Sequence, residues 1–109
     1  MSVLVGQKAP DFTAAAVMAD NSIEEAFTLS DHIKGGYGLV FFYPLDFTFV
    51  CPSEILAFDH RMDQFAKRNT KVIGVSVDSQ FTHLAWRNTP VNEGGLGQVK
   101  FPLVADLSK

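Results

Sequence analysis

The chain has 109 residues, of which 47% are apolar and 19% charged, and its formal net charge is −3. This length allows one domain with a core of moderate size. So mild a charge gives no reason to expect nucleic acid or an anionic membrane as a partner. No stretch approaches the roughly 18 apolar residues of a membrane span, and a single cysteine cannot form an internal disulfide. We therefore expect a cytoplasmic protein in a reducing compartment.

The first part of the chain predicts a β-hairpin. Residues 12–17 and 23–29 are largely apolar and lie on either side of the polar turn 19–22. This pattern is typical of two strands joined by a turn. A short helical turn over residues 30–33 follows, and the glycine pair 35–36 ends it.

The middle of the chain predicts a strand, a helix and a second strand. The run 39–43 is apolar on both faces, which is typical of a buried parallel strand. Pro52 fits the first position of the helix that follows. The helix has an apolar stripe and a charged outward face, formed respectively by Ile55, Phe58, Met62, Phe65 and by Asp59, Arg61, Lys67, Arg68. A strand over 71–77 completes a βαβ unit with a parallel sheet, so the expected class is α/β.

The last part of the chain predicts a further helix and a short strand. Ser79 can cap this helix, and the expected inner face consists of Phe81, Leu84 and Ala85. The glycine-rich stretch 93–97 ends the helical region. Residues 101–105 predict one more strand, with Pro102 near its start.

Cys51, the only cysteine, lies beyond the carboxyl end of the 39–43 strand and at the start of the following helix. In open α/β sheets, ligands bind at this end of the strands. Free backbone N–H groups and the positive end of the helix dipole favour a thiolate over a thiol. A free cysteine can also be a small buried hydrophobe. Position alone leaves these two interpretations even.

Two residues ahead of Cys51 favour the reactive interpretation. Thr48 can turn a hydroxyl toward the same space, and Pro44 lacks an N–H donor and provides an apolar wall. A thiolate that attacks a peroxide needs donors that stabilise the departing oxygen without competing as nucleophiles. Singly, each of these residues is more typical of a turn. Their spacing ahead of a cysteine at a helix start is what supports the hypothesis.

The segment from Phe42 to Glu54, FYPLDFTFVCPSE, resembles the peroxidatic motif of the peroxiredoxins, P-x-x-x-T-x-x-C. It looks most like the branch that contains the bacterial alkyl hydroperoxide reductase C proteins and the typical two-cysteine enzymes. The resemblance extends over the whole chain, through residues 8–12, 75–79, 83–86 and 94–97. It implies a thioredoxin-like fold whose core is a parallel strand–helix–strand unit with an N-terminal hairpin.

The resemblance also implies an activity, the reduction of hydrogen peroxide and alkyl hydroperoxides through a sulfenic acid at Cys51. Thr48 would hydrogen-bond the peroxide oxygens, and Pro44 would shield the sulfenic acid. Glu54 would orient an arginine, and Trp86 would support the site from behind. No cofactor or metal is implied. The implied partners are a thiol reductant, such as thioredoxin or a flavoprotein disulfide reductase, and further copies of the chain.

The family places an active-site arginine and, in this branch, a resolving cysteine beyond the point where this sequence ends. Residues 1–109 therefore predict a single incomplete domain, and we expect the chain by itself to be a poor peroxidase. We also expect it either to assemble with copies of itself or to pair with its missing half. Arg61 and Arg68 are expected to be solvated. Arg87 is the better substitute for the missing arginine, although a surface position is the plainer interpretation.

Three other functions compete with this one. A thioredoxin-type disulfide reductase needs Cys-x-x-Cys, and Glu54 occupies the fourth position here. A metal site with Cys51 would draw on the three histidines, but these are scattered and more typical of surface residues; they are His32, His60 and His83. The serious alternative is a non-catalytic interaction or holdase-like domain that keeps the half-fold. The two hypotheses differ in one test: a Cys51 that reacts with peroxide near neutral pH indicates the enzyme, and an inert Cys51 indicates the non-catalytic domain.

Overall fold

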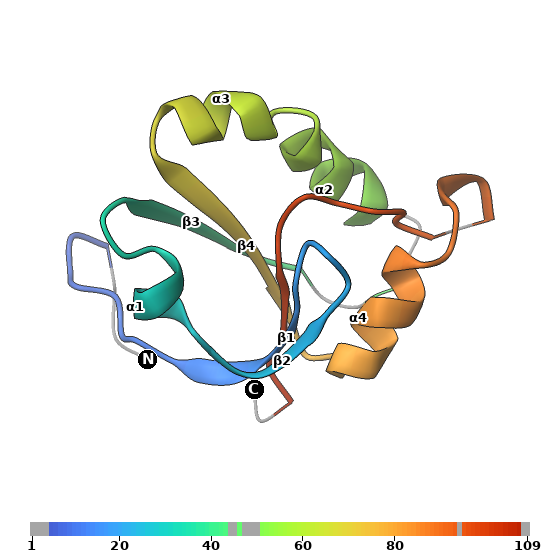
Figure 1. Ribbon diagram of the computed structural model, residues 1–109, viewed down its shortest axis with the longest axis horizontal. Helices are drawn as coiled ribbons and strands as arrows, with labels where there is room; N and C mark the ends of the chain where they lie inside the picture. The colour runs from blue at the N-terminus through green and yellow to red at the C-terminus, as the bar shows by residue number, and fades with distance from the viewer. Residues whose placement is uncertain (1–4, 44–45, 47–50, 94, 108–109) are drawn as a thin grey trace.

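The computed structural model describes residues 5–43, 46, 51–93 and 95–107, and for residues 51–53 it describes the backbone but not the side chains. One five-stranded sheet runs through this part of the chain in the order β2-β1-β5-β4-β3 (Figure 1). The strands are β1 (Thr13–Val17), β2 (Ile23–Thr28), β3 (Tyr37–Phe42), β4 (Thr70–Ser76) and β5 (Leu103–Ala105). The helices are α1 (Leu29–His32), α2 (Cys51–Asp59), α3 (Met62–Lys67) and α4 (Gln80–Arg87), with a 3-10 turn η1 (Val91–Glu93).

The N-terminal hairpin is confirmed. Strands β1 and β2 pair antiparallel, with an irregular register between Ala14 and Ala16. In the turn between them Asn21 has a φ of 71°, a backbone conformation that asparagine tolerates better than most residues. The amide of Met18 closes the turn by donating to the Ser22 carbonyl at 2.8 Å.

The parallel strand–helix–strand core is confirmed as well. Strands β3 and β4 run parallel, with Leu39 opposite Val72, and α2 and α3 form the connection between them. Strand β5 pairs parallel with β4 on one side and antiparallel with β1 on the other. The hairpin therefore extends a parallel core. Because β3 and β4 are parallel, their carboxyl ends lie at the same end of the sheet (Figure 1).

The expectation of a buried strand over 39–43 holds only in part, because Leu39 and Phe41 pack against one core cluster and Val40 against the other without being fully covered. Within the described residues β3 is the outermost strand of the sheet, and Tyr37 and Phe42 are 72% and 75% exposed. An apolar run predicts a strand, but it cannot show whether another strand lies beyond it. Only Tyr43, just after β3, is buried.

The long helix expected after Cys51 is divided in two. Helix α2 ends at Asp59 and α3 begins at Met62. Asp59 was expected to face solvent, but it is buried and its carboxylate accepts a hydrogen bond from the Lys100 amide at 2.7 Å. A carboxylate can be buried where such a donor satisfies it. Arg61, Lys67 and Arg68 are exposed, as expected.

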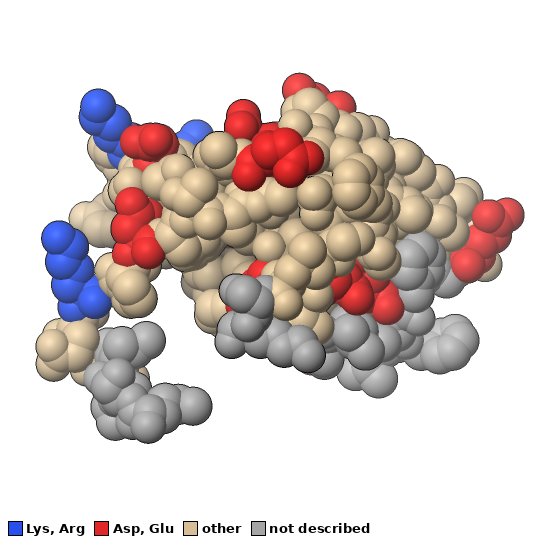
Figure 2. Space-filling model, turned by 90° about the horizontal axis from the view of Figure 1, so that it is seen from below, with Lys and Arg blue, Asp and Glu red and all other residues tan. Residues whose placement is uncertain are grey.

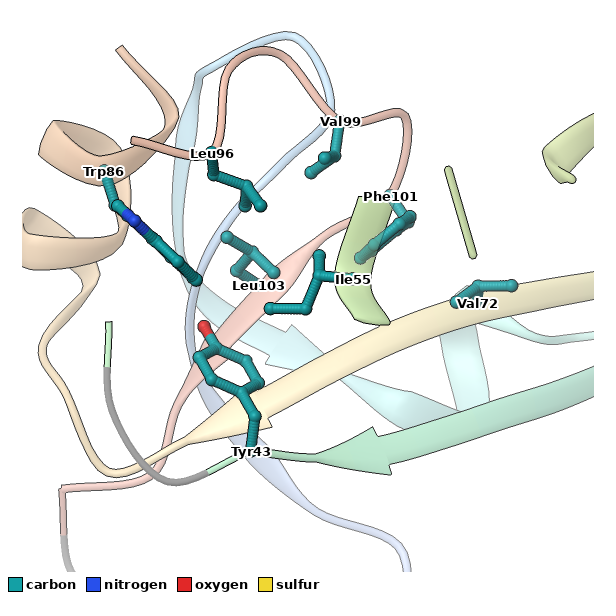
Figure 3. Packing of buried hydrophobic residues seen from close by; sticks show 8 residues of the cluster. All are labelled: Tyr43, Ile55, Val72, Trp86, Leu96, Val99, Phe101 and Leu103. Atoms are coloured by element: carbon teal, nitrogen blue, oxygen red, sulfur yellow. The ribbon is translucent and has the colours of Figure 1, made fainter. Parts of the chain in front are cut away.

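The core has two parts, one on each face of the sheet. Successive residues of a strand point to opposite faces, so Val72 of β4 joins one cluster while Ile73 and Val75 join the other. The first cluster lies between the sheet and the helices α2 and α4 (Figure 3), and it consists of Tyr43, Ile55, Val72, Trp86, Leu96, Val99, Phe101 and Leu103. Leu29 of α1 contributes to the second cluster.

Helix α4 buries a different face from the one expected. Ser79 caps it by accepting a hydrogen bond from the Thr82 amide at 3.1 Å, which confirms the predicted start. However, Phe81 is 64% exposed and Ala85 is also exposed. The buried residues of α4 are Gln80, His83, Trp86 and Arg87. Trp86 offers the largest apolar area, and the partners of His83 and Arg87 are described below.

On the face seen in Figure 2, lysine and arginine side chains lie toward one end, where acidic side chains lie among them. Further aspartate and glutamate side chains are scattered over the rest of this face. Among the described residues, no helix is both long and apolar enough to span a bilayer.

Candidate functional site

The start of helix α2 is the centre of the candidate site. The helix begins at Cys51, as expected, and Glu54 lies exposed in its first turn. The first N–H groups of any helix lack intrahelical acceptors, and they carry the positive end of the helix dipole. Pro44 and Thr48, the other expected site residues, lie outside the described residues, as does the Cys51 side chain.

Trp86 lies in the core and packs against the residue that ends β3. Its side chain is fully buried, and its ring centroid lies 5.8 Å from that of Tyr43. Tyr43 in turn is held to β4, because its amide donates to the Val75 carbonyl at 3.1 Å. Figure 3 shows the two rings side by side, with the tyrosine hydroxyl directed toward α4. Trp86 therefore supports the chain at the point where it leaves the sheet toward α2.

A buried polar cluster lies next to this aromatic pair. The Tyr43 hydroxyl donates to Oδ1 of Asp46 at 2.8 Å, and Oδ2 of Asp46 lies 2.6 Å from Nδ1 of His83. The side chains of Asp46 and His83 are both closed off from solvent. The expectation that His83 is a surface residue is therefore wrong, whereas His60 is exposed and His32 is half-buried.

The partners of His83 define where its protons are. Nε2 lies 3.0 Å from the carbonyl oxygen of Val104, and because a carbonyl only accepts, Nε2 carries a hydrogen. One further proton lies between Nδ1 and Oδ2 of Asp46, since two bare acceptors would not approach to 2.6 Å. Burial, followed by the charge of Asp46, raises the pKa of Tyr43. The tyrosine is therefore a neutral phenol that donates to the carboxylate.

Asp46 is also held through its backbone. Its amide donates to Oδ2 of Asp78 at 2.5 Å, and the Asp78 amide donates to the Ser76 hydroxyl at 3.3 Å. Asp78 follows β4, so these bonds join the segments that leave β3 and β4. These hydrogen bonds lie beyond the carboxyl ends of the parallel strands, where ligands bind in open α/β sheets.

Arg87 does not occupy the surface position considered for it. Its side chain is fully buried, and burial lowers the pKa of its guanidinium. The guanidinium donates to Oδ1 of Asn21 and to the carbonyl oxygens of Ala19, Val99 and Phe101, at 2.8 to 3.2 Å. These bonds occupy all three of its nitrogens in holding backbone segments together. Arg87 is therefore a structural residue and a poor substitute for an active-site arginine.

Sequence reasoning missed the roles of Asp46 and His83. One signal was available for Asp46, a carboxylate inside an otherwise apolar segment, where a buried charge needs a partner. For His83 the signal was spacing: positions 80, 83 and 87 follow one face of a helix. Their chemistry depends on acceptors such as Val104, which lie far away in the sequence. Within the described residues, no group of three or more His, Cys, Asp or Glu could hold a metal ion.

The architecture defines a class of protein. A parallel β-α-β core extended by an antiparallel hairpin, with a helix that begins at the sole cysteine, is a thioredoxin-like α/β fold. The chain belongs to the AhpC/TSA family, whose family model matches residues 5–109.

The relatives agree with this assignment. The chain is 52% identical to alkyl hydroperoxide reductase C of Helicobacter pylori (strain ATCC 700392 / 26695) over 98% of this chain and 54% of the relative. It is 58% identical to peroxiredoxin-2 of Mus musculus over 96% of this chain and 52% of the relative. The structure of reduced 2-Cys peroxiredoxin from Plasmodium vivax superposes with a TM-score of 0.93 at 50% identity, covering 99% of this chain and 55% of that one. The chain thus spans about half the length of these relatives.

Proposed function

We propose that this chain carries the peroxide-reacting half of a thiol-dependent peroxidase, with Cys51 as the reacting residue. The observation that carries the proposal is that α2 begins at the sole cysteine of a chain belonging to the AhpC/TSA family. A helix N-terminus favours a thiolate, and the thiolate is the form that attacks peroxides. The relatives named alkyl hydroperoxide reductase C and peroxiredoxin-2 support the same chemistry.

The proposed step is a displacement at oxygen. The Cys51 thiol first loses its proton to solvent, and the thiolate sulfur then attacks one oxygen of ROOH, where R is hydrogen or an alkyl group. The S–O bond forms as the O–O bond breaks. The product is a sulfenic acid, Cys–SOH, and the departing RO⁻ takes a proton and leaves as water or an alcohol. Sulfur loses two electrons, and the peroxide gains them.

The supporting roles are assigned as follows. Thr48 donates a hydrogen bond to the peroxide oxygens, and Pro44 shields the sulfenic acid from a second oxidation. Glu54, exposed in the first turn of α2, orients an arginine. Trp86 supports the site from the core through its contact with Tyr43.

The proposed partners are a peroxide, a thiol reductant and further copies of the chain. A thiol of a reductant such as thioredoxin or a flavoprotein disulfide reductase attacks the sulfenic sulfur, releases water and starts the return to the thiol. Self-association is supported by the exposed aromatic side chains of the outer strand β3, Tyr37 and Phe42. The expectation that the 109-residue chain reacts more slowly than a full-length relative stays a prediction.

The test is the reaction of the chain with hydrogen peroxide near neutral pH. A probe that traps sulfenic acids, followed by peptide mass spectrometry, should locate one added oxygen at Cys51. The Cys51→Ser variant is the control, and it should take up no probe. A Cys51 that reacts no faster than a free cysteine in solution would overturn the proposal. An inert Cys51 together with suppression of client aggregation would instead favour the holdase-like alternative.

A further inference from the structure

We propose that Asp46 and His83 are positioning residues for the reaction at Cys51. Their buried contact ties the chain between β3 and α2 to helix α4. This inference rests on the proposed function, because it assigns the contact to the peroxide reaction of Cys51. Neither residue touches the peroxide in this proposal. They act by holding the segment that contains Asp46 in one place.

Asp46 is held from three directions. Its two carboxylate oxygens contact the Tyr43 hydroxyl, at the end of β3, and Nδ1 of His83, in α4. Its amide donates to Asp78, which follows β4. These three anchors come from separate parts of the fold. Asp46 therefore has one position relative to the sheet and to α4, and it lies between Tyr43 and Cys51 in the chain.

His83 is a rigid anchor for this contact. Its Nε2 donates to the Val104 carbonyl in β5, so both ring nitrogens are engaged and the ring cannot turn without breaking a bond. Its neighbour on the buried face of α4 is Trp86, which belongs to the first core cluster. The imidazole is thus attached both to a strand and to a packed helix.

Stability alone is a poor explanation for this pair. An ion pair or acid–base pair without solvent contact is often no more stabilising than apolar residues of similar volume. What it does provide is a directional contact between specific atoms, which an apolar pair cannot give. Removing one partner leaves the other buried and unsatisfied, so the remaining side chain would shift to find another partner. A contact with this property suits a positioning residue.

The effect on the reaction follows from geometry. Displacement at oxygen requires the sulfur and the O–O bond to be in line, and a misplacement of about 1 Å can slow such a reaction about 100-fold. Alkylation of the same thiolate by a small reagent such as iodoacetamide has much weaker geometric requirements. Loss of the Asp46–His83 contact should therefore slow the peroxide reaction and spare alkylation.

Two variants of His83 separate the two hydrogen bonds of the ring. The amide nitrogen of asparagine falls near the position of Nδ1, so His83→Asn keeps a donor for Asp46. The amide nitrogen of glutamine falls near Nε2, so His83→Gln keeps a donor for Val104 and loses the one for Asp46. Both variants are neutral and lack the ring. His60→Gln, at an exposed histidine, is the control.

The experiment measures two second-order rate constants for Cys51 in the 109-residue chain, with thermal unfolding recorded alongside. Hydrogen peroxide is used near neutral pH. Iodoacetamide is used at about pH 9.5, above the ordinary thiol pKa of roughly 8.5. His83→Gln should lower the peroxide rate constant about 10-fold or more, and His83→Asn by less than about 3-fold. Alkylation should change by less than about 2-fold in both variants, and His60→Gln should change neither rate.

The outcomes are distinct. A peroxide rate in His83→Gln equal to that of the original chain overturns the inference and leaves the proposed function standing. Equal losses in both His83 variants, with both reagents, overturn it too, because they indicate a merely structural role. An original chain that does not react with peroxide overturns the proposed function, and this inference with it. Should His83→Gln fail to fold, Tyr43→Phe decides: it removes only the hydroxyl that Oδ1 of Asp46 accepts from, and an unchanged peroxide rate would refute the positioning role.

Discussion

The guanidinium of Arg87 donates to Oδ1 of Asn21 at 3.0 Å, although 66 residues separate the two in the chain. The same side chain donates to the Ala19 carbonyl in the hairpin turn and to the Val99 and Phe101 carbonyls ahead of β5. One buried arginine therefore joins the β1–β2 turn, helix α4 and the segment that leads into β5. Trp86, Val99 and Phe101 of the first core cluster lie in two of these elements.

Arg87→Met should destabilise the chain by about 3 kcal/mol, because it leaves buried carbonyl oxygens without donors. The free energy of unfolding in urea measures this. Arg68→Met is the matched control: Arg68 is exposed, and its guanidinium donates only to the Gln64 carbonyl. That change should cost less than about 0.5 kcal/mol. Similar losses in the two variants would show that the Arg87 bonds contribute little.

Gly95→Ala should destabilise the loop after α4. A Cβ at this buried position would lie 2.0 Å from the backbone oxygen of Thr89, so the backbone itself must shift, at a cost of about 2 kcal/mol or more. Gly97→Ala is the comparison. Gly97 has a φ of +75°, and a Cβ there would make an ordinary van der Waals contact with Val91 at 3.5 Å, so only the conformational cost of about 1 kcal/mol applies. Urea unfolding should rank the variants in this order, and a reversed order would contradict the packing described for Gly95.

The half-buried His32 should make stability depend on pH between 7 and 5. Burial, and then the charge of Lys71, lowers the pKa of His32 from its ordinary value of 6.5. The unfolded chain therefore binds more protons than the folded one in this range, and stability falls as the pH drops through 6.5 toward the lower folded value.

Unfolding free energies at pH 7 and pH 5 measure this dependence (two values on either side of the ordinary histidine pKa). In His32→Gln the difference between them should be smaller than in the original chain, whereas His60→Gln, at an exposed histidine, should leave it unchanged. The carboxylates whose pKa is lowered, Asp11 and Asp20, titrate below this window, since their ordinary value is 3.8. An identical difference in His32→Gln would show that His32 is not responsible.

Phe42→Lys should reduce self-association of the chain. Phe42 is 75% exposed on β3, the outermost strand in the described sheet, and lysine on an edge strand opposes pairing with another edge. Sedimentation velocity should show a shift toward smaller species with little change in stability. Phe81→Lys is the control, because Phe81 is 64% exposed but lies on helix α4. An equal shift in both variants would point to general hydrophobic association in place of strand pairing.

Much of the fold was predictable because the signals were local. The hairpin around the 19–22 turn and the helix cap at Ser79 follow from patterns within a few residues. The parallel pairing of β3 and β4 follows from the order strand, helix, strand along the chain. The start of a helix at Cys51 was also predictable, from Pro52 and the apolar stripe that follows. Thioredoxin-like architecture and family membership agree with the motif in residues 42–54.

Three of the wrong predictions share one physical cause. Asp59, His83 and Arg87 looked like outer residues and are buried. A polar side chain can be buried only where a remote group satisfies it. For Asp59 that group is the Lys100 amide, and for His83 it is the Val104 carbonyl together with Asp46. None of these partners is close in the sequence.

By itself, the sequence determined where the sole cysteine lies: at a helix start, beyond a strand, within a segment that resembles a peroxidatic motif. Helix capping, apolar periodicity and turn residues act over a few positions, so a linear chain displays them directly. Only the tertiary structure decided which polar residues are buried in the fold. These include Asp46 and His83, which contact each other, and Arg87. Such contacts form between segments that meet only after the sheet has been assembled, and their free energy depends on burial and on specific partners that no local pattern contains.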